Sequence, residues 1–156
     1  MEVNQQIRKK LDLPDISQVG IVVRDMDKTI EYYEKMLGLG PFVRPEISYA
    51  EKFYYGKAVD SLWMMGFCSL GPVELELIQP ITGPTIYHDF LKEKGEGIHH
   101  LGFDLKDIDE KLFLCKKMGI QVIQSGCCPT ARFAYLDTMK IGGVIFELIQ
   151  RRGRRV

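Results

Sequence analysis

The alternation of apolar and polar residues predicts several short strands, with helical patterns between them. In the stretch QVGIVVRDMD the apolar residues Val19, Ile21 and Val23 share one strand face. Acidic turn residues follow, and an amphipathic segment then ends at Gly38, which is typical of a capped helix. A further helical pattern, GPTIYHDFLKEKGEG, predicts a connecting helix over about residues 84–95.

The strand–turn–helix pattern occurs twice, which indicates an internal repeat. The segment QVGIVVRDMDKTIEYYEKMLGL, from Gln18, matches HLGFDLKDIDEKLFLCKKMGI, from His100. Gly20 matches Gly102 within it, and the acidic turn is kept. We therefore expect a pseudo-two-fold axis that brings equivalent positions of the two halves face to face.

A second shared motif extends the repeat to the end of each half. VELELIQ at 73–79 matches VIFELIQ at 144–150 through the common ELIQ. Each half has room for two more strands, near PFVRPEISYA and DSLWMMGFCSL in the first half and near QVIQSG and RFAYLDT in the second. The sequence thus predicts a single α+β domain over 1–156, with two tandem βαβββ modules at about 16–80 and 97–150.

The paired histidines His99 and His100 lie in the first strand of the second module. Neighbouring strand residues point to opposite faces, and the uniformly apolar face is expected to pack beneath the helices. His100 falls on the other face, which is expected to line a concave cup, and Gln18 is its repeat mate. We therefore expect His100, and not His99, inside the cup.

The ELIQ strands contribute a pair of carboxylates, Glu76 and Glu147. Each lies in an apolar run, where a lone carboxylate is costly to bury without a partner. Duplication gathers these two with Gln18 and His100, giving three oxygens, one nitrogen and two negative charges. This set suits one divalent metal ion per chain, and zinc, cobalt, nickel, manganese or magnesium are all candidates. Taken singly, each residue is more often an ordinary solvated or hydrogen-bonded strand residue.

Composition and charge narrow the class of protein. Of 156 residues, 21 are Lys or Arg and 21 are Asp or Glu, and this balance gives no pull toward nucleic acid or a membrane. No apolar run approaches the ~18 residues of a membrane helix, and the N-terminus lacks an apolar signal core. Four cysteines without a CxxC pair favour a reduced, cytoplasmic protein. The basic RRGRRV is expected to be a solvated tail.

The motifs QVGIVVRDMDKTIEYYEKMLGL, VELELIQP, GEGIHHLGF and GGVIFELIQ resemble the vicinal oxygen chelate superfamily, over about residues 16–150. This superfamily includes glyoxalase I, methylmalonyl-CoA epimerase, extradiol dioxygenases and antibiotic-resistance proteins. The resemblance implies an incompletely closed, eight-stranded barrel around one divalent metal, and commonly a homodimer. It places the metal ligands on Gln18, Glu76, His100 and Glu147. The last three motifs resemble the epimerase most, whereas Gln at position 18 resembles zinc-type glyoxalase I.

These features favour a metal-dependent epimerase that acts through an enolate on an acyl-CoA thioester such as methylmalonyl-CoA. Glu147 is the first candidate for the catalytic base and Glu76 the second, since two faces of one carbon need opposed bases. A glyoxalase I-type lactoylglutathione lyase, acting on a thiol hemithioacetal, is the alternative enzyme. A metal-free small-molecule binding or resistance protein is the alternative of another class, with a cup lined by Tyr49, Phe53, Tyr54, Tyr55 and Trp63.

Three other charged residues invite a functional interpretation. Arg132 can bind a carboxylate or phosphate, and Asp60 can act as a further base, although surface positions are the simpler expectation for both. Glu74 shares a strand face with Glu76 but lies near the strand start, where it is expected to be solvated.

Overall fold

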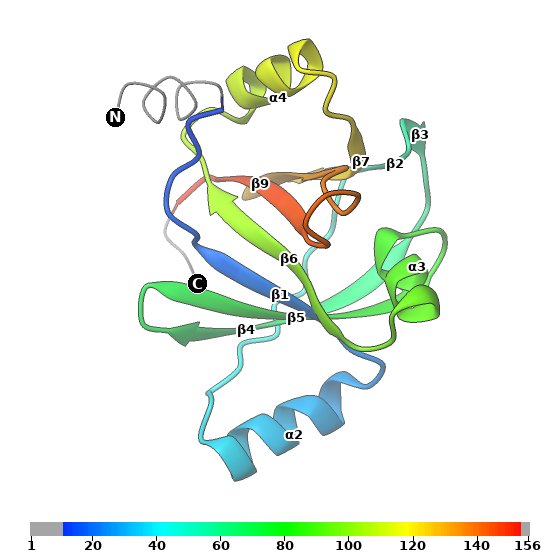
Figure 1. Ribbon diagram of the computed structural model, residues 1–156. Coiled ribbons are helices and arrows are strands. Elements are labelled where there is room, and N and C mark those ends of the chain that lie inside the picture. Colours follow the sequence, from blue (N-terminus) through cyan, green and yellow to red (C-terminus); the bar gives the residue numbers. More distant parts are fainter. Residues whose placement is uncertain (1–10, 154–156) are drawn as a thin grey trace.

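Nine strands within residues 11–153, the part of the chain that the structure describes, form one curled mixed sheet in this computed structural model (Figure 1). They are β1 (Gln18–Val22), β2 (Glu51–Tyr54), β3 (Lys57–Ala58), β4 (Leu62–Leu70), β5 (Val73–Thr82), β6 (Gly97–Asp104), β7 (Val122–Cys128), β8 (Ala131–Leu136) and β9 (Ile145–Arg151). Their order is β3-β2-β7-β8-β9-β6-β1-β5-β4. The repeat-matched strands β1 and β6 therefore lie side by side in antiparallel fashion, each flanked by a parallel ELIQ strand, β5 or β9.

Three helices of the described residues cover the sheet, namely α2 (Met26–Leu37), α3 (Ile86–Glu93) and α4 (Ile108–Lys117). Figure 1 shows α2 and α4 on opposite outer sides of the curl and α3 at one end. The matched acidic turns cap the two outer helices. The Asp25 side chain accepts from the Lys28 backbone N–H, and Asp107 accepts from those of Asp109 and Glu110.

The two faces of the central strands separate the protein's apolar clusters as the alternation predicts. Ile21 and Val23 pack outward against α2, and Leu148 and Phe146 pack outward against α4. Val22 faces inward instead. The inner cluster also takes residues from α3, so that this helix closes one end of the curl. Its buried members are Val22, Trp63, Met65, Ile78, Ile86, Tyr87, Ile123, Phe133, Tyr135 and Ile145.

The segment 41–50 differs from the strand predicted for it. Within this segment the structure places one isolated bridge, between Val43 and Phe67 on β4. Pro41 and Pro45 lack the backbone N–H that a continuous ladder needs, which explains the interruption. The segment instead leaves the β4 edge and runs on toward the second half of the chain.

The strand that follows this segment pairs across the two halves. β2 runs antiparallel to β7, and it turns back into β3 through Tyr55 and Gly56. Both turn residues have positive φ, 48° and 75°, as a tight two-residue hairpin requires. The first half thus adds a hairpin to the sheet of the second. The predicted α+β class with a curled sheet is confirmed, with nine strands in the described residues rather than the eight expected.

No helix of residues 11–153 is long and apolar enough to span a membrane.

The glutamine of each ELIQ motif joins a strand to the helix of its own module. Gln79 Oε1 accepts a hydrogen bond from the Met26 backbone N–H at 2.7 Å. Gln150 Oε1 accepts one from the Ile108 backbone N–H at 2.9 Å. Met26 and Ile108 are the first residues of their helices, where the N–H has no partner within the helix. The repeated Gln therefore has a structural role in both halves.

Replacing Gln150 by Leu should lower the free energy of unfolding by roughly 1–3 kcal/mol, because a helix N–H with almost no access to water loses its acceptor. Gln79→Leu should act similarly. Gln121→Leu, at an exposed position, is the matched control and should change the free energy by less than about 0.5 kcal/mol. Chemical denaturation of the three variants measures this, and equal effects in all three would contradict the assignment.

Candidate metal centre

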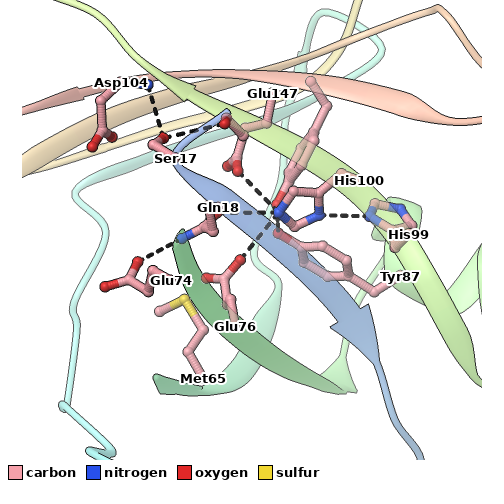
Figure 2. A network of polar contacts seen from close by, with 12 residues as sticks. Ser17, Gln18, Met65, Glu74, Glu76, Tyr87, His99, His100, Asp104 and Glu147 are labelled. Carbon is pink, nitrogen blue, oxygen red and sulfur yellow. Dashed lines mark hydrogen bonds and ion pairs between the residues drawn. The ribbon is translucent and has the colours of Figure 1, made fainter. Parts of the chain in front are cut away.

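Four side chains from four strands converge on one buried point (Figure 2). His100 Nε2, on β6, lies 3.2 Å from Gln18 Oε1 on β1 and 3.2 Å from Glu76 Oε2 on β5. It lies 3.1 Å from Glu147 Oε2 on β9. None of the four residues is more than 5% exposed. The structure thus brings together all four residues that the repeat singles out.

The donor chemistry of this cluster fits a divalent cation. An imidazole nitrogen carries at most one hydrogen, so it can satisfy only one of the three oxygens that face it. The other oxygens have their lone pairs directed at a buried site with no hydrogen to share, which is costly. Ligand atoms at about 2.1 Å from one ion stand roughly 3.0–3.4 Å apart. The contacts of 3.1 and 3.2 Å match that spacing, and Glu76, His100 and Glu147 form a group that can hold a metal.

The matched glycines of the repeat make room for this cluster. A Cβ on Gly20 would lie 1.9 Å from His100 Cε1, so the imidazole occupies the space that any other residue would fill. A Cβ on Gly102 would lie 2.9 Å from the Cβ of Gln18. Each module therefore supplies a glycine that accommodates the ligand candidate of the other, across the pairing of β1 with β6.

The register of β6 shifts at the paired histidines. Gly20 pairs with His100, but the next residue of β1, Ile21, pairs with Ile98, so that His99 is left out of the ladder. This two-against-one pattern is that of a β-bulge, which re-aims side chains. His99 is fully buried, and its Nδ1 lies 3.0 Å from His100 Nδ1. His99 is not among the four clustered residues, as expected. Strict alternation would also point its side chain away from His100, and the contact between the two rings shows that it does not.

The carboxylates determine the charge of His100. Burial disfavours its charged form, but attraction and hydrogen bonding from Glu147 and Glu76 outweigh burial and raise the pKa of His100 to about 9. Burial also raises the pKa of Glu76, with the hydrogen bond to His100 opposing it. Burial, followed by the charge of His100, lowers the pKa of His99 well below its usual range. The cluster thus favours positive charge at the His100 Nε2 side and a neutral His99.

A chain of polar contacts orients the amide of Gln18. Its Nε2 donates to Glu74 Oε1 at 2.9 Å, which directs its Oε1 toward His100 (Figure 2). Arg151 donates to Glu74 at 2.7 Å and pairs with Asp104 at 3.2 Å. Two expectations were therefore wrong. Glu74 is only 4% exposed rather than solvated, and Arg151 belongs to β9 rather than to a solvated tail. Residues 154–156 of that tail lie outside the described residues.

A cavity of about 410 Å³ opens beside the cluster. Gln18, Glu76 and Glu147 line its inner part. The segment between the Val43 bridge and β2 forms another wall, with Glu46 and Tyr49 among its residues. Sequence reasoning missed Glu46, because a strand was expected there and an exposed Glu after a proline gives no signal of its own. The remaining lining residues include Met65, Phe67, Phe133, Ile149 and Arg152.

The other residues that the sequence suggested for a functional role lie outside the four-residue cluster. Arg132 makes a two-bonded ion pair with Asp109, both contacts at 2.8 Å, and does not line the cavity. Asp60 is fully exposed and also lies outside the cavity. Of the five aromatic residues considered for the cup, Tyr49 lines the cavity and Trp63 is buried in the inner cluster. The remaining three do not line it; they are Phe53, Tyr54 and Tyr55.

Comparison with known proteins identifies the family of the chain. Residues 17–135 match the model of the Glyoxalase/Bleomycin resistance protein/Dioxygenase superfamily. The chain belongs to this superfamily. The match runs from the strand that carries Gln18 to the strand β8, and so includes three of the four clustered residues.

Proteins similar to this chain include a relative in sequence and solved structures of the same fold. The uncharacterized protein YqjC of Bacillus subtilis (strain 168) is 28% identical over 141 residues, which covers 88% of this chain and 93% of YqjC. A variant of Streptomyces coelicolor methylmalonyl-CoA epimerase, in complex with 2-nitronate-propionyl-CoA, superposes with a TM-score of 0.69 at 21% identity, covering 90% and 99% of the two chains. Methylmalonyl-CoA epimerase from Mycobacterium tuberculosis gives 0.66 at 19% identity, covering 90% of each.

Replacing Gly20 by Ala should weaken divalent metal binding by roughly 10–100-fold, because the imidazole of His100 has to leave its position. Gly102→Ala should have a smaller effect, since its closest contacts are 2.9 Å away. Gly66→Ala is the control: it lies on β4, and its nearest neighbour is the flexible Met26 Sδ at 3.2 Å. Calorimetric titration of each metal-free variant with Zn²⁺ measures the affinities. Unchanged binding in Gly20→Ala would show that His100 is not a ligand.

Proposed function

We propose that the protein is a divalent-metal-dependent epimerase that acts on an acyl-CoA thioester such as methylmalonyl-CoA. The observation that carries the proposal is the cluster of Glu76, His100 and Glu147, whose two carboxylates line a cavity of about 410 Å³. A buried set of three oxygens and one nitrogen, whose two carboxylates would balance a divalent ion, suits carbonyl chemistry beside a cavity better than a purely structural site. The fold shared with epimerases that bind acyl-CoA analogues supports the substrate class.

Gln18, Glu76, His100 and Glu147 would hold the ion. The bound ion would supply Lewis-acid polarisation of the substrate carbonyl, which makes the neighbouring C–H more acidic. The chain's own residues then have to remove the proton and return it. Glu147 and Glu76 both line the cavity, from β9 and β5, and stand on either side of His100 Nε2. Opposed carboxylates of this kind can serve the two faces of one carbon.

The walls of the cavity support a thioester with a charged acyl group. Met65, Phe67 and Phe133 offer apolar contact around the reacting carbon, which excludes water from the deprotonated centre. Arg152 is exposed at the same cavity and offers a cation for a carboxylate or phosphate. Glu46 is a further cavity carboxylate with no contact to His100, and it is a candidate base if both ligand carboxylates stay engaged.

Metal-loaded protein in D₂O should exchange the C2 proton of methylmalonyl-CoA for deuterium, as NMR measures. Glu147→Gln should slow exchange by roughly 10²–10⁴-fold, because the base is lost. Glu76→Gln should block exchange of one stereoisomer more than the other, since each carboxylate serves one face. Glu31→Gln, on the exposed surface of α2, is the matched control and should leave exchange unchanged. Metal content is measured in every variant, because both carboxylates are also ligand candidates.

Two other experimental results would assign a different function to the protein. Turnover of a glutathione hemithioacetal, without exchange on acyl-CoA, would assign a glyoxalase I-type lyase, which the Gln18 position also fits. Binding of an apolar small molecule by a chain with no affinity for divalent metals would assign a metal-free binding protein. The predicted homodimer remains a separate expectation, which light scattering tests.

A further inference from the structure

The histidine beside His100 makes an unusual contact for a strand neighbour. His99 Nδ1 and His100 Nδ1 lie 3.0 Å apart, and the two rings are nearly perpendicular at 88° (Figure 2). The contact exists because the bulge leaves His99 out of the pairing of β6 with β1. One nitrogen of this pair has to donate and the other has to accept. The direction of this hydrogen bond determines whether a neutral His100 has a hydrogen or a free lone pair on Nε2.

The environment of His100 decides the direction of this hydrogen bond. Its Nε2 faces three oxygens, two of them from carboxylates, which favours an imidazolium in the metal-free chain and a lone pair bound to the cation in the loaded chain. In both states Nδ1 of His100 carries a hydrogen, because a neutral imidazole with a free Nε2 lone pair is protonated at Nδ1. His99 Nδ1 is therefore the acceptor in both.

His99 is itself held rigidly by aromatic rings. Its ring centroid lies 5.0 Å from that of Phe90 and 5.5 Å from that of Tyr87, both on α3. The ring of Tyr135, on β8, lies 5.5 Å away. The hydroxyls of Tyr87 and Tyr135 are hydrogen-bonded to each other at 2.9 Å, which locks two walls of this enclosure. The position of the acceptor nitrogen is thus fixed by packing from α3.

A purely structural role explains His99 poorly. Its second nitrogen, Nε2, is buried and has no hydrogen-bond partner among the described residues, and the residue borders a separate cavity of about 250 Å³. Burying a polar nitrogen without a partner costs free energy, and a phenylalanine would fill the same aromatic enclosure without that cost. Among residues 11–153, the polar contact that His99 makes is the one to His100.

We propose that His99 is a positioning residue for the metal centre: its Nδ1 accepts the Nδ1–H of His100 and so holds the Nε2 lone pair of His100 toward Gln18, Glu76 and Glu147. Metal-binding histidines generally donate their second N–H to a fixed acceptor, which sets the tautomer and the ring orientation. In this chain the acceptor is another imidazole, supplied by the bulge and oriented by α3. The inference rests on the proposed metal site, but not on the identity of the substrate.

The test compares two substitutions at one position in the metal-free, full-length chain. His99→Phe keeps the ring and removes the acceptor, whereas His99→Asn keeps an acceptor near the Nδ1 position. Calorimetric titration with Zn²⁺ should show affinity reduced roughly 10–100-fold in His99→Phe. His99→Asn should recover most of that loss. Thermal unfolding of metal-free His99→Phe should stay close to the wild-type temperature, because the variant removes the unpartnered Nε2 of His99 and leaves the His100 Nδ1–H unpartnered in its place.

A spectroscopic measurement on the wild-type protein makes the proposal independent of how the variants fold. In the Zn²⁺-loaded protein, ¹⁵N NMR should show His99 protonated at Nε2 and His100 protonated at Nδ1. Wild-type affinity in His99→Phe, equal weakening in both variants, or His99 protonated at Nδ1 would each overturn the proposal. These results can be told apart from a failure of the proposed function. In that case acyl-CoA would show no exchange of its C2 proton, while the Zn²⁺ affinities of the two variants and the tautomers of both histidines would stay as stated.

Discussion

The convergence of three oxygens on one buried imidazole nitrogen is the constraint on which the rest of this structure depends. Such an arrangement is unfavourable without a positive charge at its centre. The metal-free chain meets the demand by raising the pKa of His100 to about 9, through the carboxylates that surround it. A divalent ion would meet it more fully, since it offers two charges to two carboxylates. The features around the site serve to keep these four atoms together.

The duplication explains how a short chain builds such a site. Each half contributes one residue from its first strand and one carboxylate from its last, and the pairing of β1 with β6 brings them together. Gly20 and Gly102 then make space reciprocally for His100 and Gln18. The two halves also differ in the path of their second strands. Only the first half sends its second strand across to β7, and the connecting segment forms a wall of the cavity.

Much of the site was predictable because alternation and duplication are both visible in the sequence. Two glutamates in ELIQ motifs and the matched first-strand positions sufficed to select the four residues that the structure brings together. What could not be predicted depends on pairing between distant strands. Glu74 on β5 is buried against Arg151 on β9. This contact depends on the order of the sheet, in which only β1 and β6 lie between those two strands.

The bulge at His99 was likewise invisible to a rule that assumes regular strands. The shift between Gly20 and Ile21 places one extra residue on β6, and no residue type in GEGIHHLGF signals it unambiguously. The hairpin of β2 and β3 was missed for a related reason. Its partner β7 lies about 70 residues further along the chain, beyond the reach of local patterns. Local propensity thus located the elements, and long-range pairing determined their partners.

X-ray absorption spectroscopy of the protein loaded with one equivalent of Zn²⁺ or Co²⁺ tests the central claim most directly. The four-residue site predicts one ion per chain with a single imidazole nitrogen and otherwise oxygen ligands. The signal should be lost in Glu147→Ala. A spectrum with two imidazoles would place His99 in the ligand set, and one with sulfur would move the site to the cysteines. Either result, or an ion that stays in solution, would contradict the four-residue metal centre.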